Sequence, residues 1–419
     1  MNDAHPSANE VLDLTTRLAQ LLLAGGFEGT LGLDRCLCGV AAAYGYRADV
    51  SVIAESAFIE IDGATRVVTN TPDIPQLDQV SAFKPWLTEV LAGELSFTRA
   101  RHRLEDIAAM PQPYKPWARV AGVVLFSVGF GISIQPTWQE IWVTGLLGIL
   151  VGLIKVGTER NDRAAWLAPL ASSTLVAVVV LAAAERGWVH GGTVELMIPV
   201  LFVFIPGDSI TMSVIEIAVG RLTAGAARLV QAMATLGALA FGPLLAAALL
   251  RVDRGEIYDS VVAPTLGPWS GWIGWSIFTV GVLLVFGMKR SDFPWVLGMV
   301  LGTYAVQLVA VRLFSDVAGT FVAAALMAAA CLMLGHRPSL PPAYVLYLAP
   351  FFVLTPGAHG LRGLEVLAGG TVQGVEDVGG MFILIVAIAL GMLTAFTLLP
   401  ATITERYGRP DPAPLLRRR

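Results

Sequence analysis

Ten apolar segments follow Pro116 and constrain the fold of this chain more than any other feature. They span approximately residues 118–134, 138–155, 165–184, 193–206, 227–250, 269–288, 293–312, 315–334, 343–356 and 378–400. Most of them approach the roughly 20 residues that a helix needs to cross the hydrocarbon core of a bilayer. The chain is therefore predicted to be an α-helical polytopic membrane protein with about ten transmembrane helices.

Composition supports this prediction and argues against other classes of protein. Only 14 % of the 419 residues are charged and 55 % are hydrophobic, whereas soluble domains carry about 25 % charged residues. The net charge is −4 and there is no basic stripe, so nucleic acid is not expected as a partner. The three cysteines are too few for a disulfide framework, and Cys36 and Cys38 would face different sides of a helix. Neither a metal nor a cofactor is expected.

The first 116 residues form a separate region with a dense share of the charges. Two helical patterns, two or three alternating strands around an Asp62-Gly63 turn, and two further helical patterns predict a small α+β domain. We expect four parts: a cytoplasmic α+β domain over 1–116, five-helix membrane repeats over 117–256 and 257–402, and a cytoplasmic tail over 403–419.

Basic residues predict the orientation of the chain in the membrane. With the N-terminal domain inside, 13 basic residues fall in cytoplasmic loops and the tail: Lys155, Arg160, Arg163, Arg221, Arg228, Lys289, Arg290, Arg337, Arg406, Arg409, Arg417, Arg418 and Arg419. The other side receives 5: Arg186, Arg251, Arg254, Arg312 and Arg362. This bias supports the count of ten spans and favours a multi-pass membrane protein with both ends of the chain in the cytoplasm.

The fourth and ninth apolar segments share an unusual pattern. Both are short, and each ends at a Pro-Gly pair that is followed by a glutamate before the next apolar segment begins. The corresponding residues are Pro199 and Pro350, Pro206-Gly207 and Pro356-Gly357, Glu216 and Glu365, Gly220 and Gly369, Gly225 and Gly374, and Gly242 and Gly391. Because each copy closes a block of five spans, the halves are expected to be inverted-topology repeats, which are typical of secondary transporters.

In such transporters, interrupted segments at matching positions of the two halves indicate the substrate site. A broken helix frees backbone N–H and C=O groups that lipid cannot satisfy, whereas a solute in a protein-lined cavity can. The predicted site therefore includes Pro206, Gly207, Pro356 and Gly357.

Polar side chains follow the first Pro-Gly pair. Ser209, Ser213, Glu216, Gly220 and Thr223 would share one helix face, on which Glu216 could bind an ammonium group or relay a proton. The alternative is an amphipathic cytoplasmic helix whose Glu216 is solvated or paired with Arg221. Asp208 is more simply the N-cap of this helix than a substrate ligand.

Four further residues complete the candidate site. Thr211, together with Ser209, Ser213 and Thr223, is a candidate partner for a substrate hydroxyl. Glu195 lies at membrane depth ahead of Pro199, where a carboxylate is functional by default, unless it is exposed near the surface. In the second copy Glu365 keeps its place and His359 follows the Pro-Gly pair, where it would couple export to protons or be a solvated loop residue.

Several of these stretches together resemble the threonine/serine exporter family of bacteria. They are "VLDLTTRLAQLLLAGGFEGT", "VAAAYGY", "FTRARHRLEDI" and "PGDSITMSVIEIAVGRLTAGAARL". The resemblance covers nearly the whole chain and implies export of threonine and serine driven by the proton motive force. The expected partners are then a small amino acid, protons and the lipid bilayer, and formation of a homo-oligomer is left open.

Two other hypotheses for the function are considered beside that of an exporter. One is a membrane-anchored hydrolase, for which Ser51, His102 and Asp106 are present, but without a Gly-x-Ser-x-Gly context. Anchors need no matched breaks, so an enzyme is not expected. The other is a solute channel. The sequence lacks a Gly-x-x-x-x-Gly-Lys-Ser/Thr phosphate loop, so ATP-driven pumping by this chain is not expected.

Overall fold

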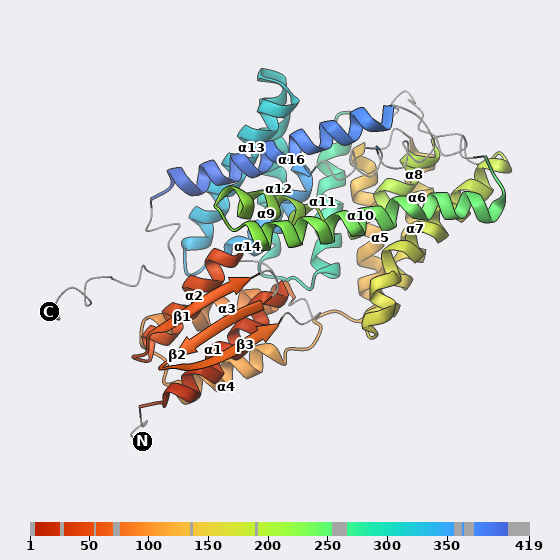
Figure 1. The fold of residues 1–419 in the computed structure, drawn as a ribbon. Helices are drawn as coiled ribbons and strands as arrows, with labels where there is room; N and C mark the ends of the chain where they lie inside the picture. Colours follow the sequence, from red (N-terminus) through yellow and green to blue (C-terminus); the bar gives the residue numbers. More distant parts are fainter. Residues whose placement is uncertain are drawn as a thin grey trace.

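The computed structural model describes residues 5–25, 29–53, 56–69, 76–134, 137–188, 192–253, 266–355, 363 and 373–400. A small N-terminal domain of helices and strands lies against one end of a larger bundle of helices (Figure 1). Two separate hydrophobic cores correspond to these two parts. The mostly helical class with a small α+β region at the N-terminus is confirmed.

The N-terminal domain contains a three-stranded antiparallel sheet in the order β1-β2-β3, flanked by helices. Its elements are α1 (Ala8–Gly25), α2 (Gly29–Ala43), β1 (Ala48–Ile53), β2 (Ser56–Ile61), β3 (Ala64–Thr69), α3 (Leu77–Leu91) and α4 (Phe97–Ala108). Asp62 and Gly63 join β2 to β3, and both have positive φ (50° and 78°), as a two-residue hairpin of type I′ requires. Alternate residues of β2, Ala57, Ile59 and Ile61, are fully buried in the core.

Every apolar segment predicted from the sequence contains a helix. The membrane part comprises α5 (Pro116–Ile134), α6 (Trp138–Thr158), α7 (Asp162–Glu185), α8 (Thr193–Leu201), the 3-10 turn η1 (Phe202–Phe204), α9 (Gly207–Ala218), α10 (Leu222–Leu250), α11 (Ser270–Val285), α12 (Phe293–Leu313), α13 (Asp316–His336), α14 (Ala343–Leu354) and α16 (Gln373–Leu398).

Fewer of these helices than ten are long enough to cross a membrane alone. In the described part of the chain, 7 helices pass by length and hydropathy, or 8 if the bent pair of α8–η1 and α9 is one span. α11 and α14 are apolar but shorter. A multi-pass membrane protein is therefore confirmed, whereas ten crossings stay a prediction.

Exposed tryptophans mark both ends of the bundle. Those at the end nearest the N-terminal domain are Trp117, Trp166 and Trp295, and those at the opposite end are Trp138, Trp142, Trp188, Trp269 and Trp272. Trp138 and Trp269 stack across α6 and α11 with ring centroids 6.0 Å apart. Tryptophan is enriched at the two membrane–water interfaces, so these two belts place the bilayer between them.

Glycines allow the closest approaches between helices of the bundle. Gly242 of α10 lies against Ser173 and Thr174 of α7, and Gly391 of α16 lies against Phe321 and Ala324 of α13. A Cβ atom at either glycine would overlap its neighbours, so only glycine fits. These are the two glycines that correspond to each other in the predicted repeat.

The N-terminal domain docks on the second half of the membrane part as well as on the first half, to which Asp34 is linked by its ion pair with Arg221. The first N–H groups of α3 donate to carbonyls that follow α11: Leu77 N to Phe286 O and Asp78 N to Gly287 O, both at 3.0 Å. Ser81 Oγ also donates to Asp292 Oδ2 at 2.6 Å. The start of α3 is thus satisfied by the end of α11, with the two helix dipoles head to tail.

Candidate functional site

The predicted break between the fourth and fifth spans is present. α8 passes through η1 to an extended Ile205 (φ −69°, ψ 120°), and α9 starts after Pro206 at an angle of 63°. A residue before proline is pushed out of the helical region, and proline offers no N–H to continue the ladder. The chain therefore breaks here for a local reason, and the break exposes the N-terminus of α9.

This N-terminus meets α14, the helix of the ninth apolar segment. A Cβ atom on Gly207 would lie 2.5 Å from Thr355 Cγ2 and 3.5 Å from Phe351 Cε1. Phe351 lies in the last turn of α14, and Thr355 is its C-cap. The start of α9 and the end of α14, which come from different halves of the chain, are thus in contact, and we call this the α9–α14 junction.

We expect Gly207→Val to stop or strongly slow solute movement, because a branched side chain would hold the junction apart or fix its packing. The cost of overpacking is about 1–3 kcal/mol, so the protein should still fold. The matched control is Gly298→Val in α12, where nothing lies within 4 Å of an added Cβ atom. Flux in proteoliposomes measures the effect, and equal flux in both variants would contradict it.

Asp208 is not the N-cap of α9, as the sequence suggested. Pro206 occupies the N-cap position and has no side-chain acceptor, while Asp208 lies in the first turn. Its Oδ1 accepts hydrogen bonds from Ser209 N at 2.7 Å and Ser209 Oγ at 3.4 Å. Asp208 also lies within electrostatic range of Arg228, Tyr344 and Tyr347. Ser209 therefore supports the carboxylate of Asp208, which faces charged and polar groups from both halves.

Glu216 is buried, with 3 % of its surface exposed. Its Oε2 accepts a hydrogen bond from Arg228 Nε at 3.1 Å. Neither part of the alternative interpretation is correct, because Glu216 is not solvated and Arg221 is not its ion-pair partner. Arg221 instead pairs with Asp34 of the N-terminal domain at 3.5 Å. A carboxylate–guanidinium pair is thus held between α9 and α10 at the side of the junction.

The polar stripe predicted on α9 is only partly correct. Ser213 is buried and its Oγ donates to Ile210 O at 2.6 Å. Gly220, however, has a φ of 84° and ends α9 in a left-handed turn, in which Arg221 N donates to Glu216 O at 2.8 Å. Thr223 lies beyond this turn in α10 and is exposed, so the stripe ends at Glu216.

Two of the remaining predicted site residues, Thr211 and Glu195, are described by the structure, and four are not. Thr211 is 1 % exposed, and its hydroxyl finds no hydrogen-bond partner within the described ranges. Glu195 lies in the first turn of α8, where the helix dipole favours a carboxylate. Pro356, Gly357, His359 and Glu365 lie outside the residues that the structure describes.

Arg228, Tyr344 and Tyr347 belong to the site but were not predicted. Arg228 follows Glu216 by twelve residues, on the far side of the turn between α9 and α10, so helical spacing does not connect them. The tyrosines lie within an apolar run of α14 and resemble core residues in the sequence. Their proximity to Asp208 arises only from the packing of α9 against α14.

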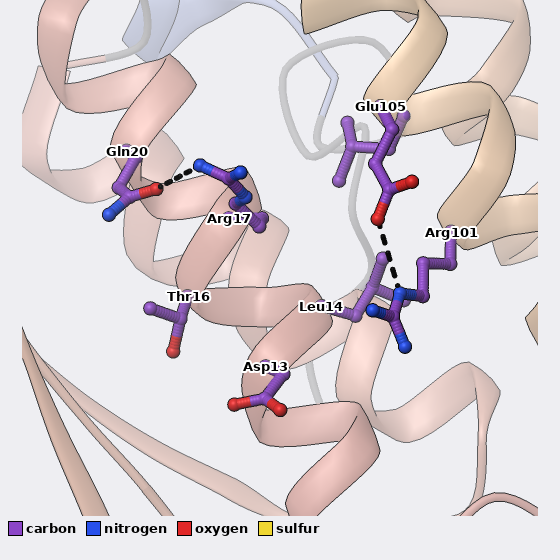
Figure 2. A pocket seen from close by; sticks show the side chains of 8 residues that line it. Asp13, Leu14, Thr16, Arg17, Gln20, Arg101 and Glu105 are labelled. Atoms are coloured by element: carbon purple, nitrogen blue, oxygen red, sulfur yellow. Dashed lines mark hydrogen bonds and ion pairs between the residues drawn. The ribbon is translucent and has the colours of Figure 1, made fainter.

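The N-terminal domain has a cavity of about 330 Å³ between α1 and α4, shown in Figure 2. It is lined by Asp13, Leu14, Thr16, Arg17, Gln20, Arg101, Leu104 and Glu105. The polar groups there have partners in the protein: Arg101 donates to Glu105 and Arg17 to Gln20, each at 3.2 Å, Thr16 Oγ1 donates to Leu12 O at 2.6 Å, and Asp13 pairs with Arg66 at 3.5 Å. A hydroxyl donating to its own helix is not poised as a nucleophile.

The hydrolase triad considered from the sequence gains no support. His102 and Asp106 pair at 3.0 Å on the exposed face of α4, and Ser51 is an exposed residue of β1. Across the described ranges, no group of three or more His, Cys, Asp or Glu side chains is placed to hold a metal ion.

Cys38 is also unsuited to nucleophilic chemistry. Burial, with a smaller contribution from the Asp34 carboxylate, raises the pKa of its thiol from 9.0 to about 12. At pH 8 we expect iodoacetamide to alkylate Cys38 at least ~100-fold more slowly in the folded protein than in denaturant, because the thiolate is the reactive form. The stabilisation from the protonated thiol is fully present below pH 9 and is lost as the pH rises toward 12. Peptide mass spectrometry measures the rates; equal rates would contradict the assignment.

Comparison with known proteins gives two matches and one negative result. The sequence model of a family described as "Putative threonine/serine exporter" matches residues 13–250. A Mycobacterium tuberculosis protein named "Probable threonine/serine exporter" is 23 % identical over 260 residues, which cover 58 % of this chain and 47 % of that protein. The chain thus spans about half the length of this relative. No solved structure matches it.

Proposed function

Because this chain belongs to the threonine/serine exporter family, we propose that it is a secondary active exporter of threonine, serine or similar small amino acids across the plasma membrane. The observation that carries this proposal is the α9–α14 junction. An anchor or a purely structural helix needs no break, whereas here the break before α9 meets the end of α14, a short helix of the other half, at Gly207 and Thr355. Such segments hold the substrate in secondary transporters.

The two halves act in this proposal as inverted repeats of five helices each. Helices α7 and α10 of the first half pack through Gly242, and helices α13 and α16 of the second half pack through the corresponding Gly391. The internal prolines Pro199 and Pro350 likewise lie in the matching short helices α8 and α14. Equivalent residues thus make equivalent contacts, which supports the repeat and the ten crossings that it requires.

The junction offers complementary groups to a zwitterionic amino acid. The positive end of the α9 dipole favours the substrate carboxylate, and the carboxylate of Asp208 favours its ammonium group. Because Gly207 and Thr355 are in contact, substrate entry requires α9 and α14 to separate. Separation and closure of the junction would then give alternating access from the two sides of the membrane.

Export is driven by the proton motive force in this proposal. Asp208 and Glu216 are carboxylates within the membrane part, where ionisable groups mark substrate and proton pathways. His359 and Glu365 of the second half are further candidates for proton transfer. The N-terminal domain and the C-terminus lie in the cytoplasm, consistent with the contacts of that domain to the loops carrying Arg221 and Arg337.

The test is counterflow of labelled threonine, serine and other metabolites in proteoliposomes, with and without a pH gradient. We expect exchange of threonine or serine and uphill accumulation when the gradient is applied. Flux of another solute without threonine or serine flux would overturn the substrate assignment. Downhill flux that ignores the gradient and shows no counterflow would identify a channel instead.

A further inference from the structure

Two buried hydroxyl groups of α9 and α14 form no hydrogen bond with any residue that the structure describes. Thr211 is 1 % exposed and Tyr347 is 8 % exposed. Among the residues that the structure describes, neither Thr211 Oγ1 nor Tyr347 OH has a hydrogen-bond partner. A buried hydroxyl without a partner costs about 1–3 kcal/mol, so such groups in a native protein require an explanation.

Neighbouring hydroxyls of the same helices are satisfied locally, which makes these two distinctive. Ser213 Oγ donates to Ile210 O at 2.6 Å, and Thr355 Oγ1 donates to Phe351 O at 2.8 Å. The hydroxyls of Thr211 and Tyr347 form no such hydrogen bond to a carbonyl of their own helix. Their hydroxyls can therefore form hydrogen bonds with a solute that enters the junction.

Each of the two residues lies close to Asp208. Thr211 lies four residues after Gly207 and three after Asp208, so it occupies the next turn on the same side of α9. Tyr347 lies one turn before Phe351, the residue nearest to Gly207 in α14 after Thr355, and the two rings are tilted by 40° with centroids 5.0 Å apart. Tyr347 also lies within electrostatic range of Asp208. One hydroxyl comes from each half of the chain.

We propose that Tyr347 and Thr211 recognise the side-chain hydroxyl of the substrate and so select hydroxylated amino acids over apolar ones of the same size. This inference rests on the proposed function and extends it to specificity. A hydroxyl can both donate and accept a hydrogen bond, and two protein hydroxyls match both capacities. A site built to bond a substrate hydroxyl rejects an analogue that lacks it, because its own polar groups are then left unpaired.

The experiment compares pairs of amino acids that differ by one hydroxyl. Unlabelled serine and alanine, and threonine and 2-aminobutyrate, compete against labelled serine in counterflow by the full chain in proteoliposomes. Tyr347→Phe and Thr211→Val are tested separately, and Tyr304→Phe in α12 is the matched control. We expect either test variant to weaken competition by serine about tenfold and to leave alanine unchanged, so that discrimination falls about tenfold.

The outcomes separate this inference from the proposed function. Unchanged discrimination in both variants, or an equal loss for serine and alanine, would overturn the role of the hydroxyls while export stands. A fall in discrimination in Tyr304→Phe as large as in the test variants would also overturn it. Absence of threonine and serine flux in the unaltered protein would remove the proposed function itself.

Discussion

Glu216→Gln is expected to lower threonine and serine counterflow at least ~10-fold while the protein remains folded. Glutamine keeps an acceptor for Arg228 Nε, which lies 3.1 Å from Glu216 Oε2, but removes the negative charge. Removing one partner of a buried pair costs up to about 3–5 kcal/mol. Here the cost should be smaller, because the Arg228 side chain is 26 % exposed and water can reach it. Flux per folded molecule, normalised by size-exclusion chromatography, measures the effect.

The double variant Glu216→Gln/Arg228→Gln separates two roles of this carboxylate. If Glu216 only neutralised Arg228, the neutral pair would recover transport. If Glu216 carries a proton or shapes the field at the junction, the double variant stays impaired and its flux no longer responds to a pH gradient. Unchanged transport in the single variant would remove Glu216 from the site.

Lys84→Met is expected to give the largest loss of stability. Lys84 of α3 is 5 % exposed, and its Nζ donates to Arg337 O and Leu340 O at 2.6 Å and to Pro341 O at 3.5 Å. These carbonyls follow the end of α13, where the helix dipole also favours a cation. Methionine fills the space but leaves these carbonyls without the Lys84 donor, at a cost of about 1–3 kcal/mol for each carbonyl that water does not reach.

Thermal unfolding in detergent and limited proteolysis measure this change. Lys115→Met is the matched control, because Lys115 is exposed just before α5. We expect Lys84→Met to lower the unfolding temperature and to speed proteolytic release of the N-terminal domain, while Lys115→Met changes neither. Indistinguishable behaviour of the two variants would show that α3 is not held to the second half by this contact.

The elements of this chain could be predicted because their signals are local. Each apolar segment contains a helix, and the Asp62-Gly63 hairpin forms where glycine and aspartate tolerate positive φ. The break at Pro206 is also local, because proline prevents continuation of α8. The number of membrane crossings could not be predicted from local signals alone, because α11 and α14 are shorter than a helix that crosses a membrane straight.

The contacts between elements could not be predicted in the same way. Helical spacing predicted that the polar stripe continues past Gly220, but the left-handed turn at Gly220 ends α9. Arg228 replaced Arg221 as the partner of Glu216 because that turn folds α10 back along α9. The sequence does not predict the docking of α3 on the second half, because Lys84 binds backbone carbonyls, and every residue carries one.

The most direct test of the account is a reversible cross-link of the junction. Gly207→Cys and Thr355→Cys are introduced together into a chain in which Cys36, Cys38 and Cys331 are replaced, and counterflow is measured before oxidation, after oxidation and after reduction. Because a Cβ atom at position 207 lies 2.5 Å from Thr355 Cγ2, the two cysteines should form a disulfide. The account predicts that oxidation stops threonine and serine flux and that reduction restores it. A complete cross-link with unchanged flux would show that the substrate does not pass between α9 and α14.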